Sequence, residues 1–191
     1  MRISFLLALA GLAVSSGQKT ESSREGSELL GKPAPSLEGL RWIGREPPPL
    51  EILRGKVVLV RRWTDGCVLC ERSAPAIREF EERYREKGLA VLAIYHPKPR
   101  PRPVEDEFVK KAAAALGLPG SIAVDAGWTV LRRWWLDRKR EFTSVSFLLD
   151  REGKVRWVHP GGEFHRSQES AHVACARAFA ELEAEVKALL R

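Results

Sequence analysis

Apolar runs and amphipathic stretches alternate along the chain and predict strands and helices in turn. Residues 57–60 and 89–95 are almost wholly apolar, as is typical of central strands that are covered on both faces. Between them, residues 74–84 place apolar side chains at three- and four-residue steps, which predicts an amphipathic helix that ends at Gly88. Because a helix crosses from one strand to the next, we expect the two strands to be parallel.

The second half of the chain carries the same two patterns in a different order. Over 167–191, apolar residues from Cys175 to Leu189 are spaced 4, 3, 4 and 3 apart, which predicts one final helix. Before the first strand, residues 29–43 are punctuated by Pro and Gly and predict short strand segments at a sheet edge. The remaining expected elements are a helix over 104–116, a short strand over 122–124, a short helix over 128–136, and an antiparallel hairpin of 145–149 and 155–159.

The first residues form a pattern of their own. Arg2 precedes a mostly apolar run over 3–14, and small residues follow at 15–17, an order that is typical of a signal peptide. Such a run is too short to span a bilayer as a helix, which requires about 20 residues, although an uncleaved anchor is the alternative. We therefore expect no stable membrane insertion after processing, and the following division: a signal peptide over 1–17, a flexible polar linker over 18–28, and one domain over 29–191.

Composition places the chain among globular proteins. Hydrophobic residues make up 44% of the chain and charged residues 30%, which excludes a disordered chain and a membrane-spanning one. The formal net charge is +7, but the basic residues are spread along the chain and form no basic motif interleaved with aromatic residues. We therefore expect acidic partners and no nucleic acid.

Two of the three cysteines, Cys67 and Cys70, stand where the first long strand gives way to the helix. A helix start presents unpaired N–H groups and the positive end of the macrodipole, so a thiol placed there loses its proton more readily. We predict that Cys67 is this nucleophilic thiol. Cys70, three residues further on, can close a small disulfide ring with it and resolve a mixed disulfide. The pair is then a reversible two-electron switch.

A structural disulfide and one half of a zinc site are the alternatives for this pair. A ring this small constrains few residues, and zinc requires four ligands, for which the sequence shows no second cluster of appropriate spacing. We therefore expect redox activity, with no metal and no cofactor. Asp65 would raise the pKa of the thiol through its like charge, whereas Arg61 or Arg62 would lower it, and the sequence leaves both effects open.

Three segments carry a resemblance to a known family. With GKVVLVRRWTDGCVLCERSAPAI, VDAGWTVLRRWWL and SVSFLLDREGKVRWVHPGG, residues 30–162 resemble the exported TlpA/ResA-type thiol-disulfide oxidoreductases of the thioredoxin superfamily. The resemblance implies an α/β thioredoxin fold, with a central mixed sheet flanked by helices, a strand-rich N-terminal addition and a long C-terminal helix. It also implies a periplasmic or otherwise extracytoplasmic enzyme. Such an enzyme exchanges a dithiol with exported protein thiols or disulfides, including apocytochromes awaiting haem, and is served by an upstream membrane redox donor.

The chain departs from this family at three positions near the cysteines. Gly66 stands where members usually have Trp, and Ser73 stands where many have a Glu that assists proton movement. Ser144 aligns with a position that is normally a cis-proline. A cis bond before a residue other than proline costs about 2.5–4 kcal/mol, so we predict an ordinary trans peptide bond before Ser144.

Two further sets of residues are candidates for chemistry. His159 and His165 follow the last expected strand, which runs back toward the edge of the sheet that carries the cysteines. They are candidates to shuttle protons to the thiols or to ligate a metal with them, and surface histidines on a Gly-rich turn are the alternative. Cys175 lies on the apolar stripe of the last helix, which favours a buried, inert thiol over an extra resolving thiol.

The sequence leaves two other functions open beside extracytoplasmic thiol-disulfide exchange through Cys67 and Cys70. A thiol peroxidase, with antioxidant activity, has a Pro and Thr pattern before its reactive cysteine. Here Thr64 is in place, but Val60 stands where Pro is usual. A thioredoxin-fold carrier of copper or another metal would use the same two thiols with a nearby histidine.

Overall fold

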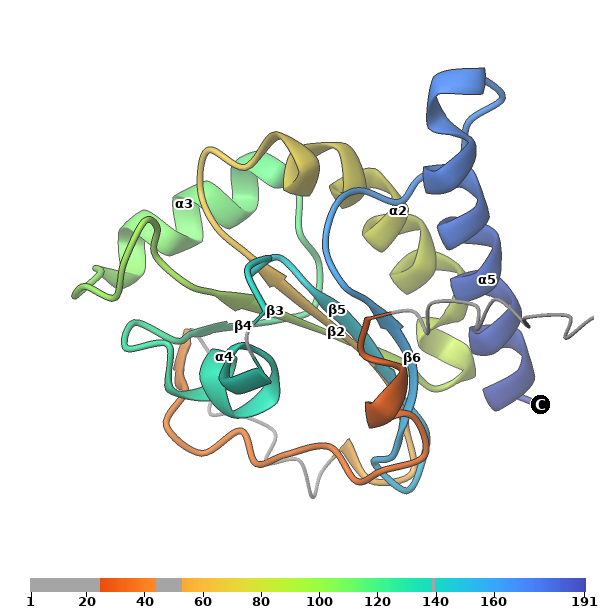
Figure 1. Cartoon of the computed structure of the whole chain (residues 1–191), viewed down its shortest axis with the longest axis horizontal. Helices are drawn as coiled ribbons and strands as arrows, with labels where there is room; N and C mark the ends of the chain where they lie inside the picture. Colours follow the sequence, from red (N-terminus) through yellow and green to blue (C-terminus); the bar gives the residue numbers. More distant parts are fainter. Residues whose placement is uncertain (1–24, 44–52, 139) are drawn as a thin grey trace, which may run out of the picture.

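The computed structural model describes residues 25–43, 53–138 and 140–191 (Figure 1). Its six-stranded sheet has the strand order β1-β4-β3-β2-β5-β6. This is the expected α/β thioredoxin arrangement. The strands are β1 (Arg41–Ile43), β2 (Val57–Trp63), β3 (Leu89–Tyr95), β4 (Ser121–Val124), β5 (Ser146–Leu149) and β6 (Val155–His159), and the helices are α2 (Val68–Tyr84), α3 (Asp106–Leu116), α4 (Thr129–Trp134) and α5 (Val173–Leu189).

Strand directions bring the functional loops to one edge of the sheet. β2 pairs in parallel with β3, and β3 in parallel with β4, as expected from the helices that connect them. β5 is antiparallel to β2 and β6 is antiparallel to β5, so the predicted hairpin is confirmed. The loops that follow β2, β3, β4 and β6 therefore share an edge with the segment that leads into β5.

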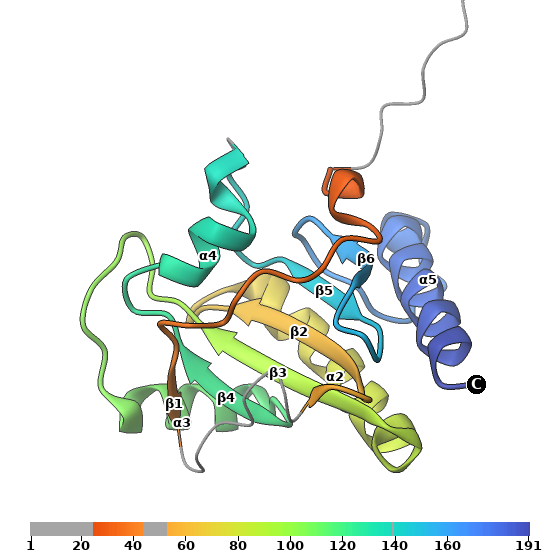
Figure 2. The same cartoon turned by 90° about the horizontal axis from the view of Figure 1, so that it is seen from below.

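The sheet is covered on both faces. Helices α2, α3 and α5 lie on one face, and α4 lies on the other together with the N-terminal residues (Figure 2). Every residue of β2 is buried. The apolar pattern predicted this strand only as far as Val60, because Arg61 and Arg62 interrupt it, yet both arginines are buried within the strand. Both arginines form polar contacts inside the fold: Arg61 with the Ser144 carbonyl and Arg62 with Asp125.

Two boundaries differ from the sequence-based expectation. The last helix was expected from residue 167, but α5 begins at Val173 after a short 3-10 turn over Ser170–His172. The Ser167 hydroxyl accepts a hydrogen bond from the Glu169 N–H at 3.1 Å, and such a local turn competes with helix formation. The expected N-terminal addition contributes β1, which pairs with β4, and an isolated bridge between Pro33 and Lys154.

The predicted signal peptide over 1–17 and most of the linker over 18–28 lie outside the described residues. Residues 25–28, at the end of that linker, already contact the fold. Gly26 is buried beside Val158 and Trp135, and the Arg140 side chain forms ion pairs with Glu25 and Glu28. In the part of the chain that the structure describes, no helix has the length and apolar content needed to cross a bilayer.

Candidate active site

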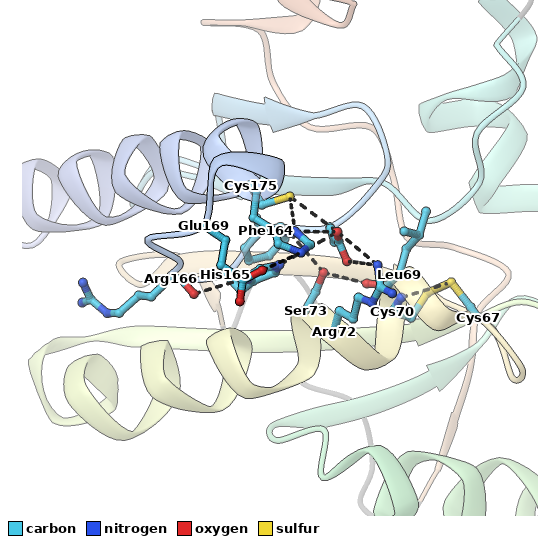
Figure 3. A network of polar contacts seen from close by, with 12 residues as sticks. Cys67, Leu69, Cys70, Arg72, Ser73, Phe164, His165, Arg166, Glu169 and Cys175 are labelled. Carbon is cyan, nitrogen blue, oxygen red and sulfur yellow. Dashed lines mark hydrogen bonds and ion pairs between the residues drawn. A yellow bond between two sulfur atoms is a disulfide. The ribbon is translucent and has the colours of Figure 1, made fainter.

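The first cysteine occupies the start of helix α2, as the sequence predicts. Cys67 is the N-cap residue, and its sulfur accepts a hydrogen bond from the Cys70 N–H at 3.2 Å. This N–H is one of the unpaired donors of a helix start, so it stabilises negative charge on the sulfur. Cys67 and Cys70 form a disulfide, with their Cα atoms 5.2 Å apart (Figure 3).

The two sulfurs differ in their access to solvent. Cys67 is half-buried and lies between the exposed residues Gly66 and Val68, whereas Cys70 is only 2% exposed. A visiting sulfur can therefore reach Cys67, while Cys70 can react only with the sulfur of its neighbour. Thiol-disulfide exchange in two steps requires this division between an attacking and a resolving thiol.

Ser144 faces both sulfurs from the segment before β5. Its hydroxyl oxygen lies 3.3 Å from Cys70 Sγ and 3.7 Å from Cys67 Sγ. The peptide bond before Ser144 is trans, as predicted. Where the family pattern has a proline ring, this chain thus places a hydroxyl group, which can donate a proton to sulfur or accept one from a thiol.

Arg61 lies beneath this contact. It is fully buried, and its Nη1 donates to the Ser144 carbonyl and to Ser146 Oγ, each at 3.1 Å. Its guanidinium also lies over the Phe164 ring, 5.6 Å from the centroid. Burial lowers the pKa of Arg61 to about 10, so the side chain stays cationic at neutral pH. A buried cation next to the loop that touches the sulfurs favours the thiolate over the thiol.

Arg62, the other candidate to act on the thiols, is engaged elsewhere. Its side chain forms a buried ion pair with Asp125. The Asp125 carboxylate also accepts from the N–H groups of Val130 and Leu131, at the start of α4. The structure therefore distinguishes two neighbouring arginines that the sequence could not. Arg61 contacts the segment beside the sulfurs, whereas Arg62 binds Asp125, which in turn binds the start of α4 on the other face of the sheet.

Asp65 accepts a hydrogen bond from a tyrosine at the same edge of the sheet. Tyr95, the last residue of β3, donates its hydroxyl to Asp65 Oδ1 at 2.6 Å. Burial, and then the hydrogen bond to Asp65, raise the pKa of Tyr95. The carboxylate of Asp65, two residues before Cys67, thus accepts a hydrogen bond from a neutral donor.

His96 is a residue of this edge that the sequence analysis missed. It follows β3 directly, is fully buried, and packs edge-on against Trp128 with ring centroids 6.0 Å apart. Burial, with further contributions from Arg62, Lys98 and Arg61, lowers the pKa of His96 well below its usual range. The imidazole is therefore neutral. A histidine that follows a buried strand without a break was the only signal for it.

The loop between β6 and α5 lies against the active-site helix, as predicted from the direction of β6. The Phe164 N–H donates to Ser73 Oγ at 3.2 Å, and the Ser73 hydroxyl donates to the Leu69 carbonyl at 2.8 Å (Figure 3). Arg72 Nη1 contacts both carboxylate oxygens of Glu163, at 3.3 and 3.4 Å. Ser73, three residues after Cys70, thus binds this loop at the position where the resemblance implies a Glu.

The histidine candidates are not arranged as expected. His159 packs between Trp157, with ring centroids 5.7 Å apart, and Phe164, with centroids 5.4 Å apart. The contacts of His165 are with Glu163, Arg166 and His172, on the far side of Ser73 from Cys67 (Figure 3). Cys175 is half-buried rather than fully buried: it precedes the buried stripe of α5, and its thiol faces Glu163 at 3.6 Å. The sequence could not show this grouping, because six residues separate His165 from His172 in the chain.

Fold and site together define a thioredoxin-fold protein with a C-x-x-C disulfide at a strand-to-helix junction, in which one sulfur is accessible and the other is enclosed. Comparison with known proteins agrees. The sequence model of the Redoxin family matches residues 31–173, and the chain belongs to this family.

Individual relatives show how far the likeness extends. The chain is 30% identical over 161 residues to protein DipZ of Mycobacterium bovis, a match that covers 81% of this chain and 22% of DipZ. The chain thus spans about a fifth of the length of that relative. It is 27% identical over 154 residues to thiol-disulfide oxidoreductase ResA of Bacillus cereus, covering 81% of this chain and 83% of ResA. The crystal structure of a thiol-disulfide isomerase from Corynebacterium glutamicum shares the fold, with a TM-score of 0.62 at 21% identity over 84% of this chain and 97% of that one.

Proposed function

We propose that this protein exchanges electrons with exported protein substrates outside the cytoplasm, through Cys67 and Cys70. The observation that carries the proposal is the unequal access of the two sulfurs at the start of α2. Cys67 accepts the Cys70 N–H and is open to a visitor, whereas Cys70 is enclosed. The ResA relative, named a thiol-disulfide oxidoreductase, supports the same chemistry.

The reaction follows from this geometry. In the reducing direction, the Cys67 thiolate attacks one sulfur of a substrate disulfide; that disulfide breaks, and its second sulfur leaves as a thiolate that takes up a proton. Cys70 then loses its proton and attacks Cys67 Sγ. The intramolecular disulfide forms, the mixed disulfide breaks, and the second substrate thiol is released. Two electrons pass from the dithiol to the substrate, and the reverse sequence oxidises a substrate dithiol.

Apolar side chains beside the sulfurs favour a protein substrate. Val68, next to Cys67, is 54% exposed, and Phe142, two residues before Ser144, is 59% exposed. Large apolar groups that remain in contact with water around a reactive centre mark a docking surface for another protein. Both lie at the edge of the sheet where Cys67 is reachable.

The predicted signal peptide over 1–17 supports the location. An oxidising compartment drives an exposed C-x-x-C pair toward the disulfide, so a reductase there requires an upstream donor, which we propose to be a membrane redox protein. Expression of the full chain followed by fractionation and N-terminal sequencing tests this point. We expect extracytoplasmic protein that begins near residues 15–18, and intact cytoplasmic protein would contradict it.

A trapping experiment tests the exchange reaction. In a Cys70→Ser variant the mixed disulfide on Cys67 cannot be resolved, so client proteins should accumulate in covalent complexes that a reductant releases. Cys67→Ser is the matched control and should trap nothing, and Cys175→Ser should behave like the unmodified protein. An equal yield from Cys70→Ser and Cys67→Ser would overturn the proposal, as would rapid consumption of peroxide without reduction of insulin.

A further inference from the structure

A second cluster of reactive side chains lies between the loop after β6 and the first turn of α5. Glu163, His165, His172 and Cys175 each offer one ligand atom, and these four atoms all lie within 4.8 Å of one another. Figure 3 shows Cys175, at the start of α5, and His165 in the same region, apart from the disulfide. None of the four takes part in the exchange reaction at Cys67 and Cys70.

The distances within the cluster match those between the ligands of a tetrahedral metal. Glu163 Oε1 lies 3.4 Å from His172 Nδ1, 3.6 Å from Cys175 Sγ and 3.9 Å from His165 Nε2. Cys175 Sγ lies 3.8 Å from His172 Nδ1. Around zinc, with its usual bond lengths, the corresponding edges are about 3.3 Å between nitrogen and oxygen and about 3.5 Å to sulfur. Small side-chain shifts are therefore enough to complete the tetrahedron.

The atoms behind the ligands orient both imidazole rings toward the cluster. His165 Nδ1 lies 3.1 Å from the Arg166 carbonyl, which can only accept, so this nitrogen carries the proton and Nε2 presents a lone pair. His172 Nε2 lies 3.9 Å from the Glu169 carboxylate, which leaves Nδ1 for the cluster. Metal-ligating histidines characteristically direct their second N–H toward a carbonyl or a carboxylate in this way.

The carboxylate ligand is supported in the same manner. Arg72, on α2, contacts Glu163 Oε2 at 3.3 Å, so this oxygen can keep its partner while Oε1 binds an ion. His172 is the N-cap residue of α5, and Cys175 stands three residues further on in the first turn, so the two side chains meet on the same side of the helix start, with Cys175 Sγ 3.8 Å from His172 Nδ1. The two halves of the cluster are therefore held by separate elements that already face each other.

We propose that Glu163, His165, His172 and Cys175 bind one Zn²⁺ ion. Two imidazoles, one thiolate and one carboxylate form a borderline-soft set of four, which suits tetrahedral zinc, and the two negative ligands balance the charge of the ion. With all four positions taken by protein, the site is structural. It joins the loop that contacts Ser73 to helix α5 and so stiffens the surface beside the active-site helix.

Metal titration of a full chain carrying Cys67→Ser and Cys70→Ser tests this site, because Cys175 is then the only thiol. We expect one equivalent of Zn²⁺ to bind, and Co²⁺ to give tetrahedral absorption bands together with a thiolate charge-transfer band. In the same background, Cys175→Ser should remove the charge-transfer band, and His172→Asn should weaken Zn²⁺ binding at least ~10-fold. His159→Asn, which alters a histidine of the same region outside the cluster, should leave binding unchanged.

The outcome is independent of thiol exchange, since the redox pair is absent. Glu163→Gln keeps the shape of the side chain and removes its charge, so it serves if a histidine variant fails to fold; circular dichroism without metal shows which variants are folded. Substoichiometric binding would overturn the site, as would equal affinity in folded Cys175→Ser, Glu163→Gln and His159→Asn variants.

Discussion

The hydroxyl oxygen of Ser144 lies 3.3 Å from the sulfur of Cys70, at the position where the resemblance to the TlpA/ResA-type family implies a proline. This contact brings a proton donor to the enclosed sulfur of the pair. It also links the pair to Arg61, which binds the carbonyl of the same serine. Ser144 therefore contacts the sulfurs through its hydroxyl and the buried cation through its carbonyl.

Replacement of Ser144 should slow the exchange reaction. A Ser144→Ala variant loses a hydrogen bond to sulfur worth about 1 kcal/mol, so we expect insulin reduction to fall by roughly 5- to 10-fold. Thr143→Val is the control, since it removes a neighbouring buried hydroxyl that has no hydrogen-bond partner in the described residues. Equal rates in the two variants would show that the Ser144 hydroxyl has no role.

Arg61 should set the reduction potential of the pair. A buried cation favours the thiolate, and hence the reduced form, so Arg61→Leu should make the protein a stronger reductant, by roughly 30 mV for a tenfold change in the equilibrium. Equilibration with glutathione measures this shift. Arg61→Lys keeps the charge and should retain most of the original potential, whereas equal shifts in both variants would point to packing alone.

His96 should make stability depend on pH. The pKa of His96 in the folded protein lies far below the usual histidine value of 6.5, so between these two values the unfolded chain binds a proton that the folded protein does not. The stabilisation is complete above about pH 6.5 and is lost as the pH falls, with a slope of up to about 1.4 kcal/mol per pH unit.

Urea unfolding at pH 7, 6 and 5 measures this effect. His96→Leu should flatten the dependence over that range. Acidic groups whose pKa values are lowered in the fold, among them Glu79 and Glu183, change stability mainly below pH 4.5, their usual pKa. They therefore do not obscure the effect of His96 between about pH 5 and 7. An unchanged slope in His96→Leu would assign the dependence to other groups.

The exposed apolar residues beside the pair should affect protein substrates selectively. Phe142→Ser and Val68→Ser remove contact area worth about 1–2 kcal/mol, so we expect KM for insulin to rise roughly 5- to 30-fold. The rate with a small disulfide reagent should stay the same. Leu30→Ser is the control: Leu30 is 46% exposed, and its neighbour Gly31 contacts Val155 at the opposite edge of the sheet. A matching effect there would indicate a general loss of stability.

Much of the fold follows from local patterns. The sequence predicted strands β2 and β3, the helix between them and the hairpin of β5 and β6. Each of these elements has a signal in neighbouring residues: a continuous apolar run, a helical spacing of apolar residues, or a turn sequence. Boundaries were less certain where side chains break the pattern. Because Arg61 and Arg62 interrupt the apolar run, the pattern predicted a shorter strand than the observed β2. The local hydrogen bond at Ser167 accompanies a later start of α5 than the pattern predicted.

The sequence by itself determined the reactive pair, since a C-x-x-C motif at a strand-to-helix junction requires only local geometry. It could not show that Arg61 reaches the active-site loop while Arg62 pairs with Asp125, or that Cys175 meets His165 and Glu163. These relationships join residues that are distant in the chain. Only the packing of helices and loops against one sheet brings them within the few ångströms over which hydrogen bonds, ion pairs and metal ligands act.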